Sequence, residues 1–147
     1  MASGTSRVAA LMSLHPEFAH LILEGRKRVE FRKRRFAETV THVVIYATGP
    51  VKQILGFFEV SRLREDTPEN LWNRYKRRGG IARNAFSAYY KQSRTGVAIE
   101  VGRVFRLPNP LDLSEVNPTA PQSFVYISQR TISELTRLVM GRKNGSR

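Results

Sequence analysis

The first third of the chain changes its hydrophobic period twice, which predicts a strand, a helix and a second strand. The segment Val8–Leu14 is almost continuously apolar and predicts a buried strand, although its periodicity also permits a helix. The segment His15–Gly25 has apolar residues at helical spacing, a first-turn proline and a terminal glycine, so it predicts a short amphipathic helix. The segment Arg28–Arg32 alternates, and a strand there would place Glu30 between two arginines on one face.

Two β-prone segments follow in the middle of the chain. The segment Thr41–Thr48 is rich in β-branched and aromatic residues, and Gly49-Pro50 after it is typical of a turn. The segment Lys52–Leu63 is apolar on both faces in its middle. Both segments are therefore predicted to form central strands.

The next segments predict two helical pieces and one more strand. Thr67-Pro68-Glu69 offers an N-cap, a first-turn proline and an acid, so a helix is expected to begin there and to end at Gly79-Gly80. A second helical piece carries aromatic residues at helical spacing: Phe86, Tyr89 and Tyr90. The segment Gly96–Phe105 alternates up to Gly102, where a bulge is expected on a strand.

A last helix is predicted after proline-bearing connections at 108–121. Thr131 and Glu134 have the spacing of a capping box, and Gly141 is the expected stop. About five strands and four helices in mixed order predict an α+β fold around a compact, mainly antiparallel sheet or small barrel. The chain has 147 residues, so we expect one domain over 7–141, with flexible tails at 1–6 and 142–147.

Charge is the strongest compositional feature. The formal net charge is +13, which concentrates polyanions around the protein and makes nucleic acid the expected partner; a basic surface without such a partner is the alternative. The sequence has no cysteine, and its three histidines lack metal-ligand spacing, so no metal or other cofactor is expected. No apolar run is long enough to span a bilayer and no export signal is evident, which predicts a cytoplasmic protein.

The basic residues gather in two runs. Arg26–Arg35 holds seven cations around the single acid Glu30. Arg74–Arg83 holds five cations and no acid, at the predicted end of a helix, where cations also suit the helix dipole. Phosphate contact and a solvated helix end both fit this second run.

Glu30 has two interpretations. A carboxylate among cations stays ionised and can orient Arg32 or accept a hydrogen bond from a base or a ribose. Alternatively it pairs with Arg28 or Arg32 across an exposed strand face, which is worth less than about 1 kcal/mol. Lys27 can reach the same pocket as Glu30 only if the strand begins after Lys27 or bulges there.

No standard catalytic motif is present, including the P-loop, G-x-G-x-x-G, G-x-S-x-G and H-E-x-x-H patterns. Several aromatic residues could stack on bases, although core packing is the commoner role. These residues are Tyr46, Tyr89, Tyr90, Phe124 and Tyr126. His15 precedes the first predicted helix and could donate to a phosphate, although a neutral turn residue is the commoner outcome.

The stretch SLHPEFAHLILEGRKRVEFRKR resembles the opening of an ASCH (activating signal cointegrator homology) domain, a branch of the PUA-like superfamily. The signature G-x-K-x-x-E-x-R of that family is met by Gly25, Lys27, Glu30 and Arg32. The stretches VVIYATGPVKQILGFFEV, GVAIEVGRVFRLPNPLDL and PQSF are also similar in order and spacing, so the resemblance covers roughly Ala9–Ile127. It implies a small β-barrel flanked by helices, with a cleft beside the signature strand that binds RNA or nucleotides.

Some members of this family are enzymes. Small bacterial members remove the acetyl group from N4-acetylcytidine with a lysine, a threonine three residues later and a distant glutamate. Lys27 matches the lysine, but Glu30 occupies the threonine position, and RRGGIARN at 77–84 offers no acid at the third. Other members are described as ribonucleases. If this chain is an enzyme, the resemblance makes Lys27 and Glu30 its candidate catalytic residues.

The sequence therefore predicts an RNA- or nucleic-acid-binding ASCH/PUA-like domain with a basic cleft around its motif, regulatory in transcription or translation. A hydrolase acting on RNA or a modified nucleoside and a basic protein-interaction module are the alternatives. The expected ligand is RNA, another nucleic acid or a nucleotide-like molecule, and a monomer is the default. The candidate ligand-binding residues are Ser13, Lys27, Glu30, Arg32, Arg34, Arg35, Tyr46, Thr48, Arg77, Arg78 and Ser123.

Overall fold

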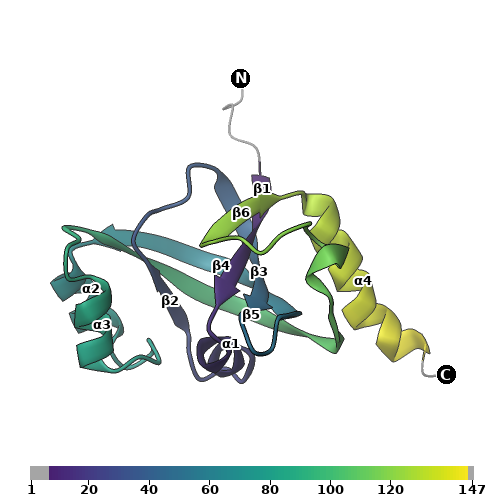
Figure 1. The fold of residues 1–147 in the computed structure, drawn as a ribbon, viewed down its shortest axis with the longest axis horizontal. Coiled ribbons are helices and arrows are strands. Elements are labelled where there is room, and N and C mark those ends of the chain that lie inside the picture. Colours follow the sequence, from purple (N-terminus) through teal and green to yellow (C-terminus); the bar gives the residue numbers. More distant parts are fainter. Residues whose placement is uncertain (1–6, 146–147) are drawn as a thin grey trace.

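The structure is a computed structural model that describes residues 7–145, with side chains described up to Gly141. Its strands are β1 (Arg7–Leu14), β2 (Val29–Arg32), β3 (Thr39–Ala47), β4 (Gln53–Asp66), β5 (Gly96–Leu111) and β6 (Phe124–Ile127). Its helices are α1 (Pro16–Leu23), α2 (Pro68–Tyr75), α3 (Arg83–Tyr89) and α4 (Gln129–Gly145), with a 3-10 turn at Leu113–Glu115. Figure 1 shows the α2–α3 pair and α4 at opposite ends of the molecule.

The strands form a single curved sheet in the order β2-β5-β4-β3-β1-β6. β1 and β3 are parallel, and the other four strand pairs are antiparallel, which confirms the mainly antiparallel α+β prediction. The expected barrel is not closed, because among the described residues no backbone ladder joins the edge strands β2 and β6. These edges are only four residues long and are joined by side chains instead, as when Arg32 donates to Ser123 just before β6.

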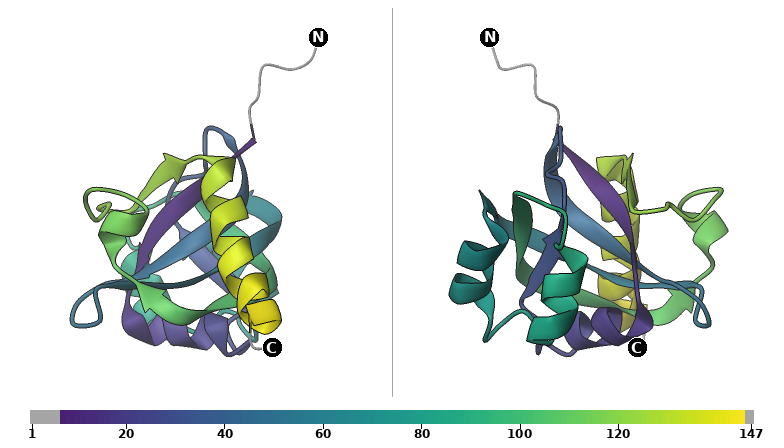
Figure 2. Two further views of the ribbon diagram at one scale, coloured as in Figure 1. Left: turned by 90° about the vertical axis from the view of Figure 1, so that its right-hand side faces the viewer. Right: turned by 60° about the vertical axis from the view of Figure 1, so that its left-hand side comes forward.

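Three buried clusters hold the helices to the sheet. Ile22 of α1 belongs to the first and Leu135 of α4 to the second. Tyr75 of α2 and Phe86 of α3 belong to the third, where they pack against the β2 residue Phe31. The two views in Figure 2 show α4 and the α2–α3 pair on different sides of the sheet. Helix α1, helix α4 and the α2–α3 pair therefore pack on three separate apolar clusters of the same sheet.

Local signals place several element boundaries as the sequence predicts. Gly25 has a φ of 79°, a left-handed conformation that favours glycine and follows the last turn of α1. The Thr67 hydroxyl accepts a hydrogen bond of 3.2 Å from the backbone N–H of Asn70 and caps α2. The register between β4 and β5 shifts beside Gly102, which confirms the predicted bulge.

Two strand predictions need correction. β6 was not expected, because its four residues are partly exposed on both faces and gain their order from antiparallel pairing with β1. β5 extends to Leu111 and therefore includes Pro108 and Pro110, for which the sequence predicts a connection. Prolines fit at this end because the missing N–H is tolerated where a strand is not flanked on both sides.

The predicted ends of the last helix are wrong. α4 begins at Gln129, and the hydroxyl of Ser128 accepts a hydrogen bond of 3.0 Å from the Arg130 N–H, so Ser128 caps the helix in place of the expected Thr131 box. The helix also continues through Gly141 to Gly145, because a helix tolerates an exposed glycine at a cost of about 1 kcal/mol. The tails expected at 1–6 and at 146–147 lie outside the described residues.

Candidate functional site

The turn between α1 and β2 delivers Lys27 and Glu30 to one place. After Gly25, the backbone N–H groups of Arg26 and Lys27 both donate to the Leu21 carbonyl, at 2.9 and 3.0 Å. β2 begins only at Val29, so Lys27 lies before the strand and is not bound by its alternation. The condition under which Lys27 and Glu30 could share a pocket is therefore met.

Both residues line a cavity of about 430 Å³. The cavity collects side chains from β1, α1, β2, the residue after β3, the α2–α3 segment and the stretch before β6. Its polar lining consists of Ser13, His15, Lys27, Glu30, Arg32, Thr48 and Gln122. Its less polar walls come from Leu14, Phe18, Phe31, Ile81, Ala85 and Tyr89. The edge strand β2 and the segment before β6 both contribute to its lining.

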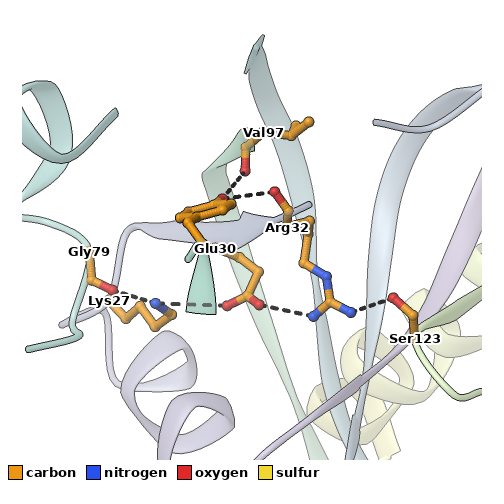
Figure 3. A network of polar contacts seen from close by, with 7 residues as sticks. Lys27, Glu30, Arg32, Gly79, Val97 and Ser123 are labelled. Carbon is orange, nitrogen blue, oxygen red and sulfur yellow. Dashed lines mark hydrogen bonds and ion pairs between the residues drawn. The ribbon is translucent and has the colours of Figure 1, made fainter. Parts of the chain in front are cut away.

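A chain of polar contacts crosses the cavity wall (Figure 3). Lys27 Nζ donates to the carbonyl of Gly79 and lies 3.7 Å from Glu30 Oε1. Arg32 Nη1 donates to Glu30 Oε2 at 3.1 Å, and Arg32 Nη2 donates to Ser123 Oγ at 2.5 Å. The side chains of Lys27, Glu30 and Arg32 are 2%, 7% and 16% exposed, so this is a buried network rather than a surface pair.

The environment of Lys27 perturbs its protonation. Burial lowers the pKa of Lys27 below its ordinary value, while the carboxylate of Glu30 opposes this shift. The ammonium also lies 4.9 Å from the ring centroid of Phe18 and 5.5 Å from that of Phe31. A buried amine with a lowered pKa beside a carboxylate in a cavity is characteristic of binding and catalytic sites.

The Gly79-Gly80 turn seats Lys27. A Cβ at Gly80, whose φ is 62°, would lie 2.9 Å from Lys27 Cβ, and one at Gly79 would lie 2.7 Å from the Phe31 ring. Both positions thus need glycine for close approach. The sequence predicted these glycines as the end of a helix, but α2 ends earlier, at Tyr75. Their role is to bring a backbone carbonyl and a tight turn against the lysine.

The structure brings many of the predicted ligand-binding residues together. The members of this group are Ser13, Lys27, Glu30, Arg32 and Thr48 in the cavity lining, with Ser123 bonded to Arg32 at its edge. Ser13 Oγ also donates to the Pro121 carbonyl at 2.6 Å, which ties β1 to the segment before β6. Residues far apart in the sequence therefore meet at this one cavity.

Other predicted residues lie elsewhere. Tyr46 does not line the cavity; it is 7% exposed and packs in the cluster beneath α4. Arg34, Arg35, Arg77 and Arg78 are exposed and lie outside the cavity lining. Their expected role in phosphate contact remains a prediction about the surface around the cavity.

Tyr89 and Gln122 line the cavity although neither was among the predicted ligand-binding residues, and base stacking was considered for Tyr89 as the less common role. Helical spacing places Tyr89 on one face with Phe86 and Tyr90, but it does not show whether that face packs in the core or lines a cavity. In the structure Tyr89 is half-buried and lines the cavity, and burial raises the pKa of its phenol. Gln122 lies in a loop without periodicity, and only the PQSF stretch drew attention to it.

Two features of the described part of the chain concern metal ligation and membrane crossing. No group of three or more His, Asp or Glu residues in it is placed to hold a metal ion. None of its helices combines the length and the apolar character that crossing a membrane requires.

The comparisons with known proteins include a family model, curated relatives and solved structures. The family model described as "ASCH domain" matches residues 12–105. A Zymomonas mobilis protein named "ASCH domain-containing ribonuclease" is 30% identical over 138 residues, which cover 90% of this chain and 93% of that protein. The crystal structure of ASCH from Zymomonas mobilis superposes with a TM-score of 0.79 at 29% identity, covering 88% of this chain and 94% of that one. A Ureaplasma parvum protein named "Large ribosomal subunit protein uL22" is 28% identical over 119 residues, 80% of this chain but 38% of that protein.

Proposed function

The chain belongs to the ASCH domain family, and we propose that it binds RNA by taking one nucleotide into the cavity beside Lys27, Glu30 and Arg32. The observation that carries this proposal is the buried chain of charges in the wall of a cavity. The protein around it has a formal net charge of +13, which favours a polyanion as the ligand. The name of the 30% identical relative supports RNA in particular.

The dimensions and lining of the cavity suit a nucleotide. Its volume of about 430 Å³ falls in the range of about 300–1,000 Å³ that is typical of small-ligand sites. The rings of Phe18, Phe31 and Tyr89 offer surfaces for a base. Lys27 Nζ and Glu30 Oε1 are 3.7 Å apart, too far for a good hydrogen bond, so a ligand can donate to one and accept from the other.

Cleavage of the bound RNA is a second candidate function. The specific observation in its favour is a lysine whose pKa is lowered by burial and which lies against a carboxylate. In such a reaction the ribose 2′-oxygen forms a bond to phosphorus, the bond to the 5′-oxygen breaks, and a cyclic phosphate and a 5′-hydroxyl result. The neutral amine of Lys27 or the carboxylate of Glu30 would accept the 2′ proton. A cation would stabilise the phosphate charge, and a protonated group would donate a proton to the leaving 5′-oxygen.

Binding is tested by fluorescence anisotropy with a single-stranded RNA oligonucleotide over a range of salt concentrations. We expect affinity to fall steeply with salt, because each neutralised phosphate releases counterions. The double variant Lys27→Met/Arg32→Ala should lose at least about tenfold in affinity, since it removes two charged hydrogen-bonding groups. Arg106→Ala is the matched control, because Arg106 is exposed on β5 and lies outside the cavity lining. Equal affinity of the double variant and the control would reject the cavity as the RNA site.

Cleavage is tested with the same oligonucleotide and its 2′-O-methyl counterpart, by mass spectrometry of the products. The proposed chemistry predicts cyclic-phosphate ends from RNA and no products from the methylated strand. If the RNA stays intact at protein concentrations well above the Kd, cleavage is rejected and the binding proposal is unaffected.

A further inference from the structure

We propose that an RNA strand leaves the cavity across residues 33–38, the loop between β2 and β3, and that this basic loop binds the phosphates next to the nucleotide in the cavity. This inference rests on the proposed function. It specifies a polymeric ligand with a direction of exit, which a cavity alone does not.

The basic loop starts at the cavity itself. It follows directly on Arg32 of β2, and its first three residues are the consecutive exposed cations Lys33, Arg34 and Arg35. The ammonium of Lys33 lies 4.8 Å from the ring centroid of Tyr89, which lines the cavity. Positive charge therefore continues without a break from the cavity edge onto the loop.

The second half of the loop is fixed from the other edge of the sheet. The hydroxyl of Tyr126 in β6 accepts hydrogen bonds from the backbone N–H groups of Ala37, at 2.7 Å, and Glu38, at 3.3 Å. Phe36 is 8% exposed and meets Phe124 edge to face, with ring centroids 4.9 Å apart. Figure 1 shows this loop at the top of the molecule, beside β6.

This anchoring matters for binding. An exposed loop that must become ordered around a ligand loses conformational freedom, which weakens the complex. Here Phe36 and the two backbone N–H groups already hold the loop, so Arg34 and Arg35 are presented from a fixed base. Tyr126 is thus a positioning residue: it holds the loop whose arginines contact phosphate.

The other basic run lacks this connection. Arg74, Lys76 and Arg77 are exposed near the end of α2, and none of them lines the cavity. That segment reaches the cavity through the backbone carbonyl of Gly79, which accepts from Lys27, and through the side chain of Ile81. Arg74, Lys76 and Arg77 are therefore not part of the cavity wall.

Two charge-matched triple variants test the path. Lys33→Ala/Arg34→Ala/Arg35→Ala should raise the Kd for a single-stranded RNA 12-mer by more than about tenfold at moderate salt. It should also make the slope of log K against log salt shallower by about 0.7 for each phosphate that the variant no longer neutralises. Arg74→Ala/Lys76→Ala/Arg77→Ala removes the same charge and should change Kd by less than about threefold. An equal or larger rise in Kd for the second variant would overturn the proposed path.

Tyr126→Phe tests the anchoring without changing charge. It should speed amide hydrogen exchange at Ala37 and Glu38 and weaken RNA binding by about two- to fivefold, because a more mobile loop must be ordered on binding. Faster exchange with unchanged affinity would reject the positioning role of Tyr126.

The two proposals fail in different ways. If the Lys27→Met/Arg32→Ala variant binds RNA as well as the wild type, the cavity proposal fails, whatever the loop does. If that variant is impaired but the basic-loop triple variant keeps the wild-type salt slope, only the exit path fails.

Discussion

Glu59 and Glu30 each form ion pairs on the sheet, but the two carboxylates differ in how deeply they are buried. Glu59 on β4 pairs with Arg103 on β5 through two hydrogen bonds of 3.2 and 2.9 Å, and the Arg103 side chain is 77% exposed. Glu30 on β2 pairs with Lys27 and Arg32, and its side chain is 7% exposed. Both pairs line a hollow, but the Glu59 side chain is 33% exposed and the Glu30 side chain only 7%, so burial is what separates them.

The difference shows why charge alone does not identify a site. The hydrogen bonds from Arg103 lower the pKa of Glu59, yet exposed pairs of this kind contribute at most about 1 kcal/mol. In the cavity, burial of Lys27 lowers the pKa of the amine. A polar ligand that contacts Lys27 can therefore change its protonation. The buried network is expected to be sensitive to substitution and the exposed pair is not.

The largest expected effect on stability comes from neutralising Glu30, and neutralising Glu59 is its comparison. Glu30→Gln leaves Lys27 and Arg32 buried without their counter-charge and should lower the free energy of unfolding by about 3 kcal/mol. Glu59→Gln should lower it by less than about 1 kcal/mol. Urea denaturation measures both. Similar losses of stability in the two variants would show that burial does not separate the two pairs.

A smaller effect is expected at the turn that seats Lys27. Gly80→Ala adds a Cβ 2.9 Å from Lys27 Cβ at a φ of 62°, and should destabilise the protein by about 1–3 kcal/mol. Gly141→Ala is the matched control, because among the described residues no atom outside its own helix turn lies within 4 Å of the added Cβ, and alanine favours the helix by up to about 1 kcal/mol. Thermal unfolding of the two variants should therefore shift in opposite directions; a neutral Gly80→Ala variant would argue against a tight seat for Lys27.

The sequence and its resemblance identified the family and the strand that carries the motif, and the family model confirms the membership. The α1–β2 turn was predictable because Gly25 stops the helix and the alternation after Arg28 marks a strand. β6 was not predictable, because four half-exposed residues carry little periodic signal and their order comes from pairing with β1.

The cavity itself was predictable only in part. The motif places Lys27, Glu30 and Arg32 close in sequence, so their meeting needs only the correct start of β2. The opposite walls come from Tyr89 and Gln122, whose approach depends on how α3 and the segment before β6 fold back. Tyr46 was predicted to bind ligand but does not line the cavity, and the strand pattern that contains it does not show that it packs beneath α4.

The smallest expected effect is the pH dependence that Lys27 confers. Its folded pKa is lowered from 10.5, so the unfolded chain holds this proton more tightly than the folded protein does. Lys27 therefore disfavours folding most below its folded pKa, and this penalty fades as the pH rises toward 10.5. The stability of the wild type relative to Lys27→Met should rise with pH in that window, by at most about 1.4 kcal/mol per unit. A difference that is flat or falls with pH would contradict the lowered pKa.

The central claim is that RNA places one nucleotide in the cavity beside Lys27, Glu30 and Arg32. Its most direct test is an NMR titration of the ¹⁵N-labelled protein with a single-stranded RNA hexamer, following the backbone amides of Ser13, Glu30, Thr48 and Gln122. We expect the largest shifts at these cavity residues and small shifts at Glu59 and Arg103. Shifts confined to the exposed pair, with the cavity amides unmoved at saturation, would contradict the account.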